Sequence, residues 1–269
     1  MTEGRRSQPH ERGWAAGQDA AAHTFAADLG DTVEITGPDG HHLQRVRRLR
    51  AGEYLTIADG AGTWRRYEIE EVAAGRLRCG ARSERVVEPD LVPHVSLAVA
   101  LTKAGSLDTV VARCTELGVA RITPIRTRRC VVKWDAAQAE RAVVRLRTTA
   151  REAAAQSRRA RLPEIGAVAD LSDLATVPGA VVAERGGLAA RSLPLPAAKK
   201  NPDFDGTNFE SELEWIVIVG PEGGLDPIEL VGMEHLPRMG LGWHVLRAET
   251  APIVAVALLL DRVREMCRE

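Results

Sequence analysis

The chain has 269 residues, of which 45% are hydrophobic and 27% charged, and its formal net charge is −1. At about 150 residues per domain this length predicts two domains, and the composition excludes a disordered or collagen-like chain. No run of about 18 apolar residues occurs and residues 1–23 lack the apolar core of a secretory signal, so we expect a cytoplasmic protein that does not span a membrane. The four cysteines form no C-x-x-C pair and no cluster with histidines, which indicates neither a metal site nor a disulfide framework.

The N-terminal third predicts a mobile tail over residues 1–24 and a small β-rich domain over residues 25–90. After the turn Pro38-Asp39-Gly40, apolar residues recur on one face of a helix predicted over residues 41–50, with Val46 on that face. Gly52 ends this helix. Turn residues separate the remaining apolar segments, which predicts antiparallel strands at residues 32–35, 54–58, 63–69 and 76–79.

Residues 91–269 predict an α/β domain, because buried strands alternate with amphipathic helices. Strands are expected at residues 95–101, 122–125, 181–183 and 215–219, and helices at residues 107–117, 136–155 and 250–268. A short acidic helix is expected to start near Asp226. Strands that are continuously apolar form a parallel sheet with helices on both faces. Residues 186–214 are rich in Pro, Asn and Asp and predict an irregular excursion.

Charge is strongly separated along the chain although the total is close to zero. Residues 121–161 hold eleven arginines and one lysine against three acidic residues, a net charge of +9. Residues 201–234 hold nine acidic residues and no Lys or Arg. A positive field of that size attracts polyphosphate. On charge alone, a nucleic-acid-binding surface and a solvated basic helix matched by an acidic one across a subunit contact are equally supported.

The sharpest local motif is a glycine-rich loop directly after the strand predicted at residues 215–219. Its three glycines let the backbone approach a ligand closely and point N–H groups at it. It lacks the Gly-Lys-Ser/Thr of a phosphate loop, and Glu222 places negative charge where a phosphate would lie. The loop therefore disfavours a nucleoside triphosphate and favours a neutral or cationic ligand such as an adenosyl sulfonium compound. An ordinary tight turn is the more frequent use of such glycines.

A second motif, residues 241–251, leads through a turn and a charged loop into the last helix. Thr250 is expected to cap that helix, whose free N–H groups then offer a polar site. Arg247 and Glu249 are placed to orient a substrate, although a structural ion pair is the more frequent fate of such a pair.

A third motif, residues 152–163, ends a helix in a basic loop. There Arg159 offers a planar fork suited to phosphate, and Gln156 is able to read a base edge. Arginines at a helix end also serve as caps, but the cluster with Arg126, Arg128, Arg129 and Lys133 exceeds what capping needs.

Several motifs follow one another over most of the chain: Gly40-His41-His42, Val46-Arg47-Arg48-Leu49, Gly52-Glu53, Lys103, Thr115-Glu116-Leu117-Gly118-Val119, Pro124, Arg129, Gln156-Ser157, Arg159, Pro163, Gly220-Pro221-Glu222-Gly223-Gly224 and Leu246-Arg247-Ala248-Glu249-Thr250-Ala251. Together they resemble the RsmE family, the bacterial 16S rRNA (uridine 1498-N3)-methyltransferases of the SPOUT class. Two positions depart from the family pattern: Ala155 stands where Glu is common, and His244 stands where many members have Arg.

The resemblance implies a PUA-like RNA-binding β-barrel at residues 25–90 and a SPOUT α/β domain with a trefoil knot at residues 91–269, an exception to the rule that chains do not thread loops. It also implies a homodimer that acts on 16S rRNA within the small ribosomal subunit and binds S-adenosylmethionine in the knotted loops, without a metal. The implied cofactor-binding residues are Val219, Gly220, Pro221, Glu222, Gly223, Gly224, Leu241, Gly242, Val245, Leu246, Arg247, Ala248 and Thr250. The implied RNA-binding residues are Arg45, Arg48, Lys103, Arg128, Arg129, Gln156 and Arg159.

Methyl transfer to uridine N3 is an in-line displacement, for which an enzyme mainly holds donor and acceptor in near-attack geometry. N3 carries a proton, so a group must accept it while charge at O2 and O4 is stabilised. Glu249 is the candidate base or orienting group, and Arg247 or Arg159 the candidate for charge stabilisation. Two alternatives stay open: a SPOUT methyltransferase that acts on another RNA, and a non-catalytic PUA-like RNA-binding assembly factor.

Overall fold

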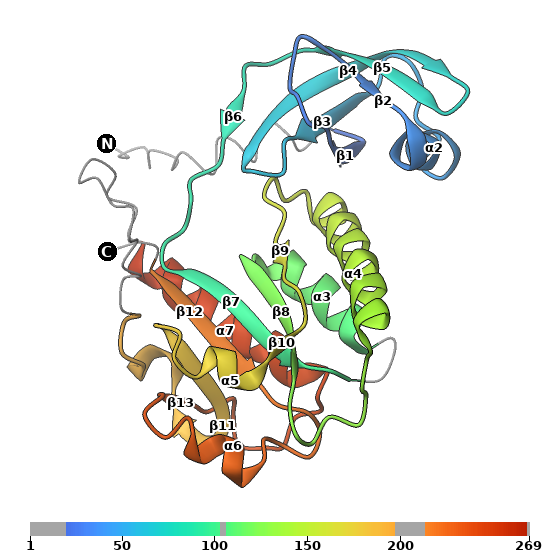
Figure 1. Ribbon diagram of the computed structural model, residues 1–269. Helices are drawn as coiled ribbons and strands as arrows, with labels where there is room; N and C mark the ends of the chain where they lie inside the picture. Colours follow the sequence, from blue (N-terminus) through green and yellow to red (C-terminus); the bar gives the residue numbers. More distant parts are fainter. Residues whose placement is uncertain (1–19, 103–105, 197–212, 268–269) are drawn as a thin grey trace, which may run out of the picture. The chain divides into compact units, whose positions relative to one another are not determined.

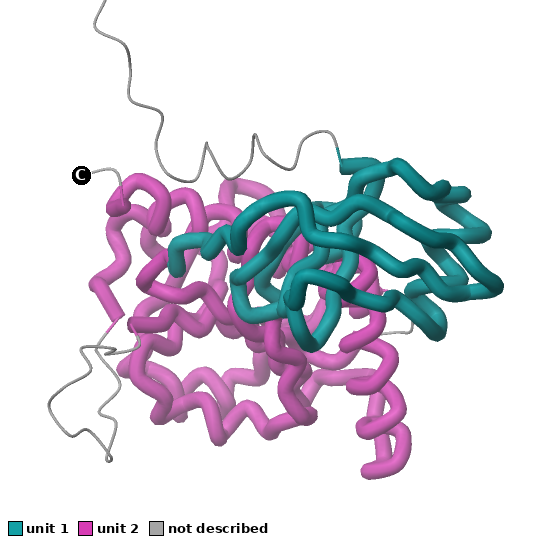
Figure 2. The backbone as a smooth tube through the Cα atoms, turned by 90° about the horizontal axis from the view of Figure 1, so that it is seen from above, with its two compact units in different colours: residues 1–90, 154–162 teal, residues 91–153, 163–269 magenta. Residues whose placement is uncertain are grey.

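The computed structural model describes residues 20–102, 106–196 and 213–267. These residues form two compact units, each with its own hydrophobic core, which Figure 2 shows in different colours. The first unit extends to Asp90 and also takes in Ala154–Leu162, whereas the second comprises Leu91–Ala153 and the chain from Pro163 onward. None of the helices in the described ranges is long and apolar enough to cross a membrane.

A largely antiparallel sheet and one helix make up the first unit. The strands are ordered β1-β3-β4-β5-β2 with β6 paired to β4, and the β1–β3 pair is parallel. The elements are β1 Ala22–Phe25, β2 Thr32–Ile35, α2 Gly37–Arg45, β3 Tyr54–Ala58, β4 Thr63–Ala73, β5 Arg76–Ala81 and β6 Val86–Val87 (Figure 1). Alternate side chains of the strands fill the core, with Leu55, Ile57, Tyr67, Ile69 and Leu77 fully buried.

Strand β1 overlaps residues that the sequence analysis predicts to be part of a mobile tail; residues 1–19 lie outside the described residues. Residues 22–24 were assigned to the mobile tail, but they belong to β1, which pairs with β3. His23 lies opposite Thr56, 33 residues away. The strand therefore depends on a distant partner, which local sequence patterns do not reveal.

Helix α2 starts and ends before the predicted residues 41–50. The segment Pro38-Asp39-Gly40, predicted as a turn, forms its first turn, where the missing N–H of proline costs no hydrogen bond. The chain leaves the helix before Arg48, whose φ of 55° lies in the left-handed region. Val46, predicted on the buried face, is consequently 66% exposed.

The second unit is a parallel sheet with helices packed against it, as the alternating β and α segments predict. Its strand order is β10-β8-β7-β12-β11-β13 with β9 paired to β8, and each of these pairs is parallel. The strands are β7 His94–Ala100, β8 Arg121–Arg126, β9 Glu164–Ile165, β10 Ala169–Asp170, β11 Ala180–Leu188, β12 Glu214–Val219 and β13 Arg238–Met239. The helices are α3 Ser106–Leu117, α4 Ala136–Ser157, α5 Leu171–Leu174, the 3₁₀ helix η1 Ala190–Ser192, α6 Pro227–Val231 and α7 Thr250–Met266. Helix α7 packs on α3 and covers β7 and β12 (Figure 1).

The predicted excursion over residues 186–214 is partly regular structure. Residues 186–188 continue β11, η1 follows, and residues 197–212 lie outside the described residues. Gly187 serves a close contact: a Cβ there would lie 2.6 Å from the backbone of Arg238 in β13. The glycine therefore lets two strand backbones approach, a role that its sequence context does not distinguish from a turn.

Candidate active site

The motifs of the second unit that carry candidate functional residues lie at one edge of its sheet. Because the paired strands are parallel, their carboxyl ends share an edge. The glycine loop follows β12, residues 240–249 follow β13, and the basic segment 127–135 follows β8. Ligands of open parallel sheets bind outside these carboxyl ends. The structure thus brings together motifs that lie about a hundred residues apart in the chain, such as Arg129 and Gly223, 94 residues apart.

The glycine loop is a tight turn with an exposed crest. The N–H of Gly224 donates to the carbonyl of Pro221 at 2.8 Å, and Gly224 has a φ of 69° that favours glycine. Glu222, Gly223 and Gly224 are exposed. Gly220 is needed for packing, since a Cβ there would lie 3.1 Å from Leu225. The loop therefore presents main-chain groups and one carboxylate at the edge of the sheet.

Helix α6 begins directly after this loop with a capping box. The Asp226 carboxylate accepts a hydrogen bond from the N–H of Ile228 at 3.0 Å, and the Glu229 carboxylate accepts one from the N–H of Asp226 at 2.9 Å. The helix starts where the sequence predicted it. The D-x-x-E spacing is itself a recognisable signal, which the sequence interpretation did not use.

Part of the basic stretch docks on this acidic helix start within the same chain. Arg129 donates from Nη1 to the carbonyl of Gly223 at 2.8 Å, and its Nε lies 3.4 Å from the Asp226 carboxylate. The backbone N–H of Arg128 donates to Glu229 at 2.7 Å. Arg128 and Arg129 thus meet acidic residues of their own chain, and these contacts need no second subunit. The side chain of Arg128 is exposed.

The segment after β13 carries the remaining predicted cofactor-binding residues. Gly242 has a φ of 135°, and no atom lies within 4 Å of a Cβ placed there, so a ligand is able to approach the backbone closely. Leu241, Leu246, Ala248 and Thr250 are half-buried. Trp243 and Val245 are 92% and 82% exposed. These two side chains make this loop the most exposed apolar part of the edge.

Glu249 and Arg247 are close but not tightly paired. The Arg247 guanidinium is 86% exposed, and its Nη1 lies 4.0 Å from Oε1 of Glu249. The other oxygen of Glu249 accepts a hydrogen bond from the hydroxyl of Ser106, the first residue of α3, at 3.3 Å. The prediction that Thr250 caps α7 is wrong: Glu249 occupies the N-cap position, and the Thr250 N–H donates to the carbonyl of Arg247. The polar site expected at this helix start thus consists of Glu249 with a serine that no motif marked.

Arg159 and Gln156 lie in the first unit rather than with Arg247 and Glu249. Ala154 and Ala160 pack with Phe25, Ala58 and Trp64, which is why the end of α4 joins that unit. Burial lowers the pKa of Arg159 to about 10, the nearby Glu88 carboxylate opposes this shift, and Arg161 adds to it. Lys103, the remaining predicted RNA-binding residue of the second unit, lies outside the described residues.

His23, whose pKa is affected by Arg158 and Arg159, is buried, and we expect it to make the stability of the folded chain depend on pH. Burial lowers its pKa from 6.5 to about 4, the backbone of Arg159 opposes the shift, and the charge of Arg158 adds to it. Between about pH 4 and 6.5 the unfolded chain therefore binds one more proton than the folded chain, so the free energy of unfolding rises with pH in this window. Below the window the folded chain has lost about 3 kcal/mol of this free energy.

The measurement for His23 is urea unfolding at pH 4.5, 5.5 and 7. We expect His23→Gln, which can keep a hydrogen bond to Thr56 (Nδ1 to Oγ1, 2.8 Å), to flatten the dependence by about one proton relative to the parent chain. Parallel curves for the two proteins would show that His23 is not the titrating group.

Two groups of arginines in the first unit differ in their partners. Arg76, Arg78 and Arg82 on β5 and its continuation form ion pairs with Glu34, Glu68, Glu70 and Glu71. The arginines at the end of α2 and just after it are exposed and form no ion pair with any described residue; they are Arg45, Arg47, Arg48 and Arg50. The second group, which we call the α2 patch, leaves a net positive charge available to an anionic partner.

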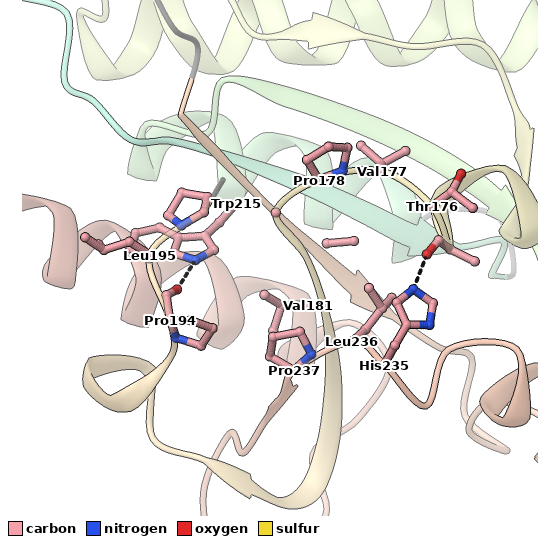
Figure 3. A pocket seen from close by; sticks show the side chains of 14 residues that line it. Thr176, Val177, Pro178, Val181, Pro194, Leu195, Trp215, His235, Leu236 and Pro237 are labelled. Carbon is pink, nitrogen blue, oxygen red and sulfur yellow. Dashed lines mark hydrogen bonds between the residues drawn. The ribbon is translucent and has the colours of Figure 1, made fainter. Parts of the chain in front are cut away.

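Two hollows of the second unit lie on different sides of its sheet. One of about 240 Å³ opens at the opposite, amino edge of the sheet, where Trp215 Nε1 donates to the carbonyl of Pro194 at 3.2 Å and His235 Nε2 to that of Ala175 at 2.8 Å (Figure 3). Four prolines line it, and its lining includes no carboxylate or guanidinium. A second, of about 570 Å³, lies between the end of β8, α5 and α6. Among the described residues, no group of His, Cys, Asp or Glu is arranged to hold a metal ion.

Two family models match the chain. A model described as an RNA methyltransferase domain matches residues 89–260, and one described as an RNA methyltransferase PUA domain matches residues 35–79. Proteins named ribosomal RNA small subunit methyltransferase E are similar over most of the chain. The Mycobacterium bovis protein is 33% identical, over 85% of this chain and 86% of its own length, and the Bacillus subtilis protein is 26% identical, over 85% and 89%.

Solved structures share the fold. A putative methyltransferase from Legionella pneumophila in complex with S-adenosylmethionine matches with a TM-score of 0.76 and 25% identity, over 89% of this chain and 96% of its own. A ribosomal RNA small subunit methyltransferase E from Neisseria gonorrhoeae bound to S-adenosylmethionine matches with a TM-score of 0.72 and 22% identity, over 88% and 95%. A PUA-like unit followed by a SPOUT α/β unit is therefore the architecture of this chain.

Proposed function

The chain belongs to the ribosomal RNA small subunit methyltransferase E family, and on that premise we propose that it transfers a methyl group from S-adenosylmethionine to N3 of uridine 1498 of 16S rRNA. The substrate in this proposal is the small ribosomal subunit in the cytoplasm. The observation that carries it is the convergence of the glycine loop, the Gly242 turn and Glu249 at the carboxyl edge of one parallel sheet. This is the edge at which such sheets bind nucleotide-like ligands.

The residues at this edge fit S-adenosylmethionine. Open space surrounds the positions that a Cβ would take at Gly224 and Gly242, so the adenosine portion is able to approach the main chain. The exposed carboxylate of Glu222 suits a cationic sulfonium and would repel a triphosphate. When bound, S-adenosylmethionine supplies a methyl group on positively charged sulfur.

Arg247 and Glu249 are proposed to manage the charge and the proton of the target base. As the N3–carbon bond forms and the carbon–sulfur bond breaks, the Glu249 carboxylate accepts the N3 proton. The exposed Arg247 guanidinium stabilises the negative charge that develops at O4. The Ser106 hydroxyl, which donates to Glu249, orients the carboxylate. Arg159 of the first unit is a second candidate for charge stabilisation.

The α2 patch is proposed to hold the RNA while the target base is unpaired. N3 lies on the Watson–Crick edge, so a paired uridine must be extruded before it reacts. Extrusion costs free energy that contacts to the flanking phosphates can offset. Arg45 and Arg48, with their uncompensated charge, are suited to that contact.

The α2 patch predicts a difference between two arginine pairs of one unit. We expect Arg45→Ala with Arg48→Ala to weaken RNA binding and to lower the slope of log K against log salt by about 2, roughly one for each phosphate that the variant no longer neutralises. The matched control is Arg78→Ala with Arg82→Ala, which removes equal charge from arginines already paired with glutamates. Binding measured between 50 and 200 mM salt checks this. Equal slopes for the two double variants would contradict the patch.

We also propose a homodimer and a trefoil knot in the second unit. Trp243 and Val245 on the loop and Leu258 on α7 are exposed apolar side chains, which a contact between two protomers would bury. Light scattering is expected to give twice 29.1 kDa. The knot is supported by the route of the chain, which passes from β12 to β13 beyond β11 and then returns in α7 over β7 and β12.

Product mapping tests the function directly. The purified protein is incubated with radiolabelled S-adenosylmethionine and small ribosomal subunits that lack the modification, and the methylated nucleoside is identified and located. We expect 3-methyluridine at position 1498. Label at another nucleotide would show a methyltransferase that acts on a different target. If the protein binds RNA but labels neither naked rRNA nor subunits, a non-catalytic assembly factor is favoured.

A further inference from the structure

Arg129 links the glycine loop to the start of helix α6. Its Nη1 donates to the carbonyl of Gly223 at 2.8 Å, and its Nε lies 3.4 Å from Asp226, the N-cap residue of α6. One guanidinium thus contacts a peptide within the loop and the carboxylate that starts the next helix. The planar guanidinium directs its donors at both groups in a fixed geometry, whereas a lysine ammonium is a compact point charge on a flexible stem.

Holding the Gly223 carbonyl adds a second restraint to the peptide between Gly223 and Gly224, whose N–H already donates to the Pro221 carbonyl at 2.8 Å. Gly223 and Gly224 are exposed, and their lack of a Cβ leaves their dihedral angles free. Rotation of this peptide would break both hydrogen bonds and change the shape of the turn, so a loop that binds a ligand through main-chain groups loses affinity when the peptide is not held. The Arg129 contact supplies such a restraint from outside the loop.

The neighbouring Arg128 carries the same charge but makes a different contact. Its side chain is exposed, and it joins the acidic helix start through its backbone N–H, which donates to Glu229. The two arginines therefore carry equal charge at adjacent positions, but the side chain of Arg129 alone reaches the loop within the described contacts.

We propose that Arg129 is a positioning residue that holds the glycine loop in the conformation that binds S-adenosylmethionine, rather than a contact to RNA phosphate. The inference rests on the proposed function and deepens it. Within the basic stretch, Arg129 then supports cofactor binding and the exposed side chain of Arg128 contacts RNA.

The test compares Arg129→Ala, Arg129→Lys and Arg128→Ala in the full chain. The dissociation constant of S-adenosylmethionine is measured by calorimetry without RNA, and kinetics on small subunits separate KM for the cofactor from kcat. We expect Arg129→Ala to raise the dissociation constant and the cofactor KM about tenfold, the loss of one charge-assisted hydrogen bond, with kcat at saturating cofactor within about threefold of the parent. Lysine at position 129 should recover part of this loss, and Arg128→Ala should leave cofactor binding within about twofold.

Each result decides the inference. If Arg129→Ala binds S-adenosylmethionine as tightly as the parent and weakens RNA binding as much as Arg128→Ala does, Arg129 is an RNA contact and the inference is wrong. If Arg129→Ala fails to fold, the comparison of Arg129→Lys with Arg128→Ala decides in the same way. A parent chain that does not bind S-adenosylmethionine at all overturns the proposed function itself, before any variant is compared.

Discussion

Glu249→Gln is expected to lower kcat for methylation of small subunits by about 10²–10⁴-fold, because the amide is unable to accept the N3 proton. The substitution keeps the shape of the side chain and one carbonyl oxygen that can accept from Ser106. Affinity for S-adenosylmethionine should therefore stay close to that of the parent. Single-turnover methylation with labelled cofactor, at saturating concentrations of both substrates, measures the effect.

Two companion variants separate proton transfer from positioning. Ser106→Ala removes the hydroxyl that contacts Glu249 but leaves the carboxylate, so we expect a loss of about tenfold or less. Arg247→Ala removes the exposed guanidinium and should lower kcat at saturating cofactor. Full turnover by Glu249→Gln would remove Glu249 from the mechanism and leave solvent water as the proton acceptor.

Gly179→Ala is expected to destabilise the second unit by about 3–5 kcal/mol, a large share of the stability of an ordinary domain. Gly179 precedes β11 with a φ of 81°, and a Cβ there would lie 1.9 Å from the carbonyl oxygen of Glu214. The same glycine accepts a hydrogen bond from the N–H of Ile216 at 3.0 Å, which fixes its position beside β12. The backbone of β12 is therefore unable to move aside without breaking the pairing.

Gly186, within β11, provides a matched control. Its φ of 82° is nearly identical, but no atom lies within 4 Å of a Cβ at that position. Gly186→Ala should therefore cost only the left-handed backbone conformation, about 1–2 kcal/mol. Urea unfolding followed by the fluorescence of the buried Trp215 reports on this unit. Equal losses for the two variants would show that backbone conformation, and not the clash with Glu214, sets the cost.

Local patterns in the sequence predicted most of the regular structure. The continuous apolar runs of β7 and β12 predict buried parallel strands, and the 3.6-residue period predicts α3, α4 and α7. Both signals depend on neighbouring residues, so they survive without knowledge of the fold. The same holds for the glycine loop, whose residue types suit close backbone approach wherever it lies. The family resemblance rests on the same kind of ordered local motif.

Tertiary structure decided which of these pieces meet. Strand β1 exists because it pairs with β3, and residues 154–162 join the first unit because Ala154 and Ala160 pack on Phe25 and Trp64. Arg159 consequently belongs to a different unit from Glu249, and Arg129 contacts the glycine loop. From charge and composition alone, Arg129 and Arg159 are predicted equally well to contact RNA. The partner of each of these side chains comes from a segment distant in the sequence. Spacing along the sequence does not tell which distant segments lie close together in the folded chain.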